Sequence, residues 1–151
     1  MAVYIEEISQ EFPCPGFGDV DVSQKKTIAV YGSGSDVLGR WYDRAFENIR
    51  ARVPNVEFIG VDLTDSPKLS AKLPWVGYFN AQEFNRAAWQ SHTSKVHIGG
   101  QEINVDGAIV AVWPKDHLQI AQLWVPKAPV LIEKPIVMPA ELDQLEQLVA
   151  V

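Results

Sequence analysis

The residues best suited to chemistry stand at the end of an apolar run, where residues 130–132 lead directly into Glu133, Lys134 and Pro135. The proline restricts the backbone just after the charged pair. An ammonium group held at such a position can stabilise negative charge that develops on a carbonyl or alkoxide oxygen. We therefore expect Lys134 to be the catalytic residue. A solvated ion pair on the surface is the alternative interpretation.

A glycine-bearing turn follows an earlier apolar run, where residues 27–31 lead into Gly32, Ser33 and Gly34. Glycines at such a turn let the backbone approach a pyrophosphate, and a serine hydroxyl can donate to phosphate. The dinucleotide pattern Gly-x-Gly-x-x-Gly is only partly matched, because Val37 stands at the third glycine position. We expect a cofactor-binding loop here, with a plain strand-to-helix turn as the alternative.

An acidic residue, Asp62, ends the second predicted strand, residues 56–62. An acid at this point can accept hydrogen bonds from both hydroxyls of an adenosine ribose, and its charge would repel a 2′-phosphate. Asp62 therefore favours NAD over NADP as the cofactor. The alternative interpretation is a cap on the turn that follows the strand.

A third candidate loop follows the apolar run 108–112 and contains Trp113, Pro114 and His117. The flat side chain of Trp113 or Pro114 could lie along a nicotinamide ribose. His117 could serve as a general acid or base, although a single histidine in the first turn of a helix is more often structural.

The loops are separated by alternating apolar runs and amphipathic segments. Strands that alternate with helices predict a Rossmann-like, doubly wound α/β fold with a mostly parallel sheet covered on both faces. Gly99 and Gly100 predict a small hairpin inserted at 96–105. The other elements are expected as strands at 27–32, 56–62, 107–112 and 129–132 and as helices at 36–52, 67–73, 82–91, 117–125 and 139–149, the last with Leu142, Leu145, Leu148 and Val149 facing inward.

Composition limits the class of protein. The chain has 151 residues and suits one domain, residues 27–151, preceded by an extension, residues 1–26. Its net charge of −6 argues against nucleic-acid binding, and no apolar run is long enough to span a membrane. Cys14 is the single cysteine, so we expect no internal disulfide, no metal site and a cytoplasmic location.

The ordered set of glycine turn, strand-end acid, Pro-x-x-His loop and Glu-Lys-Pro resembles the nucleotide-binding half of the glucose-fructose oxidoreductase and inositol dehydrogenase family (Gfo/Idh/MocA). The resemblance covers roughly residues 27–150, and it implies hydride transfer between NAD and a hydroxyl or carbonyl carbon of a sugar or polyol. It also implies that Gly32, Ser33, Gly34 and Asp62 contact the adenosine and pyrophosphate, that Trp113, Pro114 and His117 line the nicotinamide side, and that Glu133 and Lys134 lie at the ring.

Family enzymes complete their active site with a second domain, and we expect this chain to correspond to the nucleotide-binding half alone. Two other functions stay open. One is a non-catalytic domain for nucleotide sensing or oligomerisation, in which a homodimer covers the surface that a second domain would bury. The other is a methyltransferase that uses S-adenosylmethionine, which shares the glycine turn and the acid but gives no role to Glu133, Lys134 and Pro135.

Overall fold

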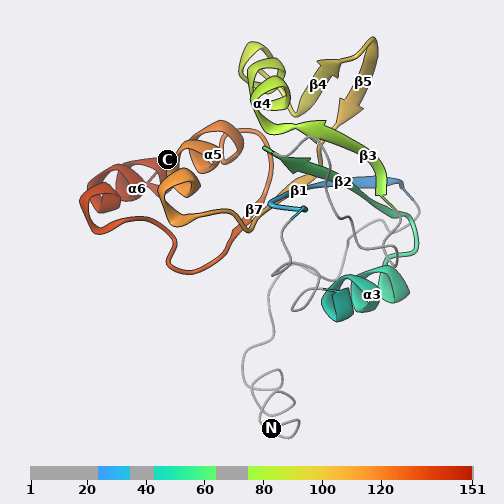
Figure 1. The fold of residues 1–151 in the computed structure, drawn as a ribbon, viewed down its shortest axis with the longest axis horizontal. Helices are drawn as coiled ribbons and strands as arrows, with labels where there is room; N and C mark the ends of the chain where they lie inside the picture. The colour runs from blue at the N-terminus through green and yellow to red at the C-terminus, as the bar shows by residue number, and fades with distance from the viewer. Residues whose placement is uncertain (1–23, 35–42, 64–74, 151) are drawn as a thin grey trace, which may run out of the picture.

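A five-stranded parallel sheet flanked by helices forms the body of the protein (Figure 1). The computed structural model describes residues 24–34, 43–63 and 75–150. Most of the predicted extension, the first part of the predicted helix 36–52 and the predicted helix 67–73 lie outside these ranges. The elements are β1 (Lys26–Tyr31), α3 (Asp43–Arg52), β2 (Val56–Asp62), β3 (Trp75–Asn80), α4 (Ala81–Gln90), β4 (Lys95–Ile98), β5 (Gln101–Asn104), β6 (Gly107–Val110), α5 (Pro114–Trp124), β7 (Val130–Ile132), the 3₁₀ turn η1 (Pro139–Glu141) and α6 (Leu142–Val149).

The strand order is β3-β2-β1-β6-β7, and every neighbouring pair is parallel. This confirms the predicted α/β class with a parallel sheet. The edge strand β3 was not predicted from the sequence, because Gly77 interrupts its apolar residues and five of its six side chains are only partly buried. Its register with β2 shifts between Phe58 and Ile59, which is typical of an irregular edge.

The central strand β1 is buried on both faces, as expected for a parallel sheet covered on two sides. Because successive side chains point to opposite faces, Ala29 and Tyr31 pack towards α4 and α5, while Val30 packs towards α3. Phe46 anchors α3 on its side, and Trp124 anchors α5 on the other. The two apolar clusters are therefore separated by the sheet itself.

The predicted hairpin is confirmed as an antiparallel pair of β4 and β5. Gly99 and Gly100 have φ values of 58° and 76°, which suit the two central residues of a type I′ turn. Val96 and Val105 are fully buried on the inner face of the hairpin, which packs against α4. The hairpin thus extends the core on the side of α4 and α5.

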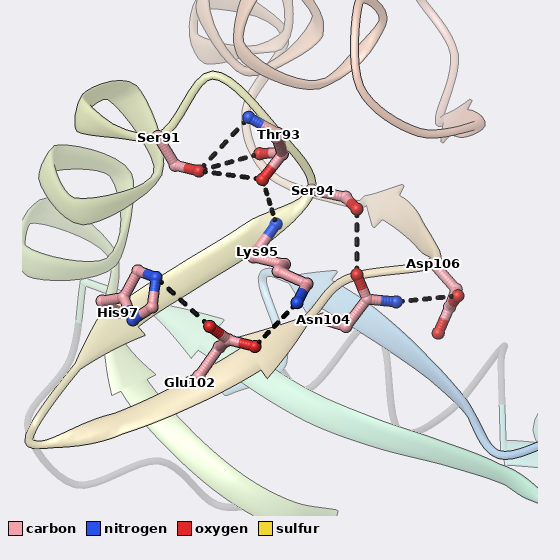
Figure 2. Close-up of polar contacts among 8 residues, drawn as sticks. All are labelled: Ser91, Thr93, Ser94, Lys95, His97, Glu102, Asn104 and Asp106. Carbon is pink, nitrogen blue, oxygen red and sulfur yellow. Dashed lines mark hydrogen bonds and ion pairs between the residues drawn. The ribbon is translucent and has the colours of Figure 1, made fainter.

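Polar side chains fill the outer face of the hairpin, as Figure 2 shows. Lys95 lies 3.0 Å from Glu102, and His97 lies 3.4 Å from the other oxygen of the same carboxylate. The hydrogen bond and charge of Lys95 lower the pKa of Glu102 from its ordinary value, and His97 adds a smaller effect. Because these groups are exposed, their pairing contributes little to stability.

Two C-terminal predictions needed correction. The helix expected at 117–125 begins earlier, at Pro114, since proline lacks an N–H that the first helical position does not need. The prediction that the last helix is buried was wrong, because no residue of α6 is buried and Leu142 and Val149 are 51% and 66% exposed. The loop after β7 directs α6 away from the sheet faces. None of the helices in the described ranges has the length and apolarity that a bilayer span requires.

A buried chain of hydrogen bonds links β1, α4 and α5 within the core. The indole Nε1–H of Trp124 donates to the Tyr31 hydroxyl over 2.7 Å, and that hydroxyl donates to Asn85 Oδ1 over 2.7 Å. Each polar atom in this chain is therefore paired. Burial raises the pKa of Tyr31 well above its ordinary value, and this effect outweighs the hydrogen bond from Trp124, which lowers it.

We predict that Tyr31 makes the fold sensitive to alkaline pH. Above about pH 10 an unfolded tyrosine loses its proton while folded Tyr31 keeps it, so stability falls by up to about 1.4 kcal/mol per pH unit from this group. Tyr31→Phe costs about 1–3 kcal/mol at neutral pH, because it leaves Trp124 and Asn85 unpaired. The stability of the Tyr31→Phe variant should decline less steeply with rising pH than that of the parent. Urea unfolding of both proteins at several pH values from neutral to alkaline measures this difference. Parallel pH curves for both proteins would contradict this assignment.

Candidate functional site

The predicted loops meet at one edge of the sheet. Because the strands are parallel, the carboxyl ends of β1, β2, β6 and β7 share this edge. The chain runs from β1 outward through β2 to β3 and then crosses to β6 on the other side of β1. In open α/β sheets, ligands bind outside the strand ends at such a reversal of strand order. We call this edge the crevice edge.

Gly32 makes the first turn of the crevice edge possible. Its φ of +83° is a conformation that side-chain-bearing residues rarely adopt, and an added Cβ would lie 2.3 Å from the carbonyl oxygen of Ala111. The Gly32 N–H donates to the carbonyl oxygen of Val61 over 2.9 Å. The turn is therefore held against both β2 and the loop after β6.

Asp62 ends β2 beside this turn. One carboxylate oxygen accepts the N–H of Gly34 over 2.8 Å, and the other accepts the N–H of Leu63 over 2.6 Å. The structure thus brings together the glycine turn and the acid that the sequence predicted as neighbours. A backbone N–H of the turn already holds a negatively charged oxygen, and the carboxylate remains partly exposed.

Ser33 lies in the same turn but points away from solvent. Its side chain is 2% exposed, and its hydroxyl has no hydrogen-bond partner. The hydroxyl sits over Gly60 of β2, where an added Cβ would lie 2.7 Å from it. In this conformation the Ser33 hydroxyl is not presented to a phosphate group. Gly34 and Asp62, both partly exposed, form the accessible polar surface here.

Trp113 ends the loop between β6 and α5, and Pro114 begins the helix. The Trp113 side chain is 76% exposed, and Pro114 occupies the first position of α5. With Lys115 and Met138 they line a shallow pocket of about 320 Å³. Two of these pocket residues, Lys115 and Met138, were not predicted from the sequence. Lys115 lies within the loop already singled out, whereas Met138 is brought there only by the fold.

His117 lies behind the loops rather than on the surface of the crevice edge. Its imidazole is fully buried, with Nε2 3.0 Å from the carbonyl oxygen of Val112. Its Nδ1 lies 2.9 Å from the carbonyl oxygen of Pro135 and 3.0 Å from that of Ile136. Both ring nitrogens therefore lie within hydrogen-bond distance of backbone carbonyl oxygens. His117 joins the loop after β6 to the loop after β7.

The Glu-Lys-Pro segment continues directly from β7. The N–H of Glu133 donates to the carbonyl oxygen of Val110 over 2.9 Å, so the parallel pairing extends one residue past β7. Glu133 is partly buried and Lys134 is exposed, and the peptide bond between Lys134 and Pro135 is cis. No described residue forms an ion pair with Lys134, so its ammonium group is free to meet an anionic ligand at this edge.

We predict that His117 holds the two loops in place. His117→Ala should lower the free energy of unfolding by about 2–4 kcal/mol, because it opens a cavity and leaves backbone carbonyls unpaired. Hydrogen exchange should rise in residues 133–137 more than in β1. His92→Ala, at an exposed position, is the matched control and should change neither quantity. Equal exchange rates in the His117 variant and the parent would show that the loops are fixed by other contacts.

We also predict that Gly60 must stay small beneath the turn. Gly60→Ala would place Cβ 2.7 Å from the Ser33 hydroxyl and 3.0 Å from Tyr78 Cδ2, at a cost of about 1–3 kcal/mol in thermal or urea unfolding. Ser33→Ala removes an unpaired hydroxyl and should leave stability unchanged or slightly higher. The double variant should recover part of the loss, and an additive result would contradict the proposed contact.

The crevice edge offers the partly exposed backbone at Gly34, a strand-end carboxylate, an exposed aromatic ring and an exposed ammonium group, a combination suited to a ligand with anionic and aromatic parts. In residues 24–34, 43–63 and 75–150 there is no group of three or more His, Cys, Asp or Glu side chains that could hold a metal. Comparison of the chain with protein-family models, curated proteins and solved structures found no match.

Proposed function

We propose that the chain is a doubly wound, Rossmann-like domain whose crevice edge binds NAD(H). The contact between Asp62 and the N–H of Gly34 is the observation that carries the proposal. It couples the turn expected at a pyrophosphate to the acid expected at an adenosine ribose, at the point where the strand order reverses. The negative charge of Asp62 disfavours a 2′-phosphate, and hence NADP.

In this proposal, different residues of the crevice edge contact different parts of the cofactor. Gly34, which is partly exposed, receives the pyrophosphate by close backbone approach at the turn that Gly32 shapes, and Asp62 accepts the ribose hydroxyls. Trp113 and Pro114 offer flat apolar surface on the nicotinamide side. The nicotinamide supplies or accepts the hydride, and the ammonium group of Lys134 offsets negative charge on the oxygen of the substrate.

The substrate class is proposed from the resemblance to the Gfo/Idh/MocA family. A sugar or polyol carbon that bears a hydroxyl or carbonyl would react at the nicotinamide once a second domain holds it. The exposure of Lys134 supports this part of the proposal, because the lysine must meet a ligand that arrives from solvent. Glu133, partly buried beside it, extends the strand and fixes the start of this loop.

A second candidate function, nucleotide sensing without turnover, is favoured by His117. A catalytic acid or base must reach the proton that it transfers. The His117 imidazole is fully enclosed, and both of its nitrogens face backbone carbonyls. This histidine therefore serves the framework in either case, and turnover would depend on groups beyond those of the described crevice edge.

We predict that the intact chain binds NADH more tightly than NADPH, as measured by calorimetric titration. Asp62→Asn should weaken NADH binding roughly tenfold or more, because charge-assisted hydrogen bonds contribute about 1.5–3 kcal/mol. The same change should narrow or reverse the preference over NADPH. Glu47→Gln removes an exposed carboxylate on α3 and should leave both affinities unchanged.

The outcome also separates the candidate functions. Binding without any change of nicotinamide absorbance, either when NADH meets a sugar carbonyl or when NAD⁺ meets a polyol, favours nucleotide sensing. Oxidation that Lys134→Met slows, while NADH affinity holds, favours the oxidoreductase. Tighter binding of S-adenosylmethionine than of either nicotinamide cofactor would select the methyltransferase. Absence of binding to all three by folded protein would reject the crevice edge as a nucleotide site.

A further inference from the structure

An apolar groove lies on the α3 face of the sheet, away from the crevice edge. It has a volume of about 390 Å³ and extends across the amino ends of β1, β6 and β7. Much of its lining is aliphatic and comes from these strands, from the last turn of α3 and from the residue after α3. We define the groove by these residues: Ile28, Ile49, Val53, Ile109 and Leu131.

Among the described residues, α3 covers only part of this face of the sheet. Phe46 of α3 packs with Phe58 and Ile109, which fills the space over β2 and the near side of β6. Further out, Leu131 of β7 points to the same face and is 62% exposed. The described helices α4 and α5 pack on the opposite face, so none of them covers Leu131. A parallel sheet ordinarily has both faces covered by helices.

Helix α6 of the same chain has an apolar stripe that no described residue buries. In α6, Leu142, Leu145 and Val149 follow the i, i+3, i+7 spacing of an apolar stripe, and none of them is buried. Leu142 and Val149 are more than half exposed. An isolated helix shorter than about 12–15 residues is marginal in water, so α6 requires packing against an apolar surface.

The α6 of the same chain is held away from the groove. His117 fixes the carbonyl groups of Pro135 and Ile136, and the next residue, Val137, is only 7% exposed. The N–H of Met138 then donates to Glu141 Oε2 over 2.9 Å, which closes η1 just before α6. Figure 1 shows α6 and α3 at opposite sides of the molecule. To enter its own groove, α6 would have to undo η1 and the anchors before it.

The charges of α6 and of the rim of the groove are also complementary. Residues 142–149 carry Asp143 and Glu146 and no basic side chain. The last turn of α3, beside the groove residues Ile49 and Val53, carries Arg50 and Arg52. Docking of α6 along the groove brings opposite charges to its rim, which favours this helix over a basic one.

We propose that α6 of one copy docks into the apolar groove of a second copy. The contact joins two different surfaces, so it is heterologous, and each added copy still offers a helix and a groove for the next. Copies of the chain therefore associate head to tail.

The experiment compares the oligomeric state of full-length variants by sedimentation velocity over a range of concentrations. We expect the parent to associate increasingly as its concentration rises, and Leu131→Asp and Val149→Asp each to raise the dissociation constant between copies at least roughly tenfold. Both side chains are more than half exposed, so neither change disturbs the monomer core. Leu63→Asp is the matched control: it is 63% exposed, lies at the crevice edge and should leave association unchanged.

Disulfide trapping identifies which chain supplies the helix. In a Cys14→Ser background, chains with Leu131→Cys and chains with Val149→Cys should form a mixed disulfide dimer when combined. A disulfide within one chain that carries both cysteines, without mixed dimers, would overturn the proposal. A parent that stays monomeric at all concentrations would also overturn it, as would aspartate variants that associate as well as the parent. NADH titration of the same variants reports the crevice edge separately.

Discussion

The end of β1 sets the geometry on which the site depends. Gly32 lies so close to the backbone of Ala111 that no side chain fits between them, and its N–H stays bonded to Val61. The turn therefore fastens the central strand to its neighbours on both sides. Because the loop after β6 leads directly into α5, the same contact also fixes where that helix begins. A looser turn would release the strand ends from one another, and with them the surface that we assign to the ligand.

The helix α5 connects this edge to the core. At its first turn, His117 contacts the carbonyl groups of two loops, and at its last residue, Trp124 donates to the buried hydroxyl of Tyr31. Lys127, just beyond the helix, donates to the carbonyl oxygen of Ala88 near the end of α4, and partial burial lowers its pKa from the ordinary value. The helix is thus fixed at both ends by buried polar contacts, which specify its position more strictly than apolar packing alone.

Much of the framework could be predicted from the sequence, because apolar runs, turn residues and strand-end polar residues are local signals. That Asp62 and the glycine turn lie at the same edge of the sheet followed from the rule that parallel strands end at one edge, whereas the hydrogen bond between them was not predicted. The rest depended on tertiary contacts. Ser33 looked like a phosphate ligand, but Gly60 makes a space that its hydroxyl fills. The apolar stripe of α6 was predicted to be buried, but none of its residues is buried. Whether a helix packs against the sheet depends on the path of the loop before it, which the sequence pattern does not give. Met138 reaches the pocket through that same loop.

The hairpin has a consequence for engineering of the protein. Its tip consists of Gly99 and Gly100, and nothing lies within 4 Å of the position that a Cβ would take at either residue. Its base is fastened independently, since Asp106 accepts the N–H of Thr27 and donates its own N–H to the carbonyl oxygen of Thr27. A peptide tag or a fluorescent reporter inserted between the two glycines would project into solvent and would not disturb the packing of the parallel sheet. Exposed tips of this kind are where chains accept inserted sequence most readily.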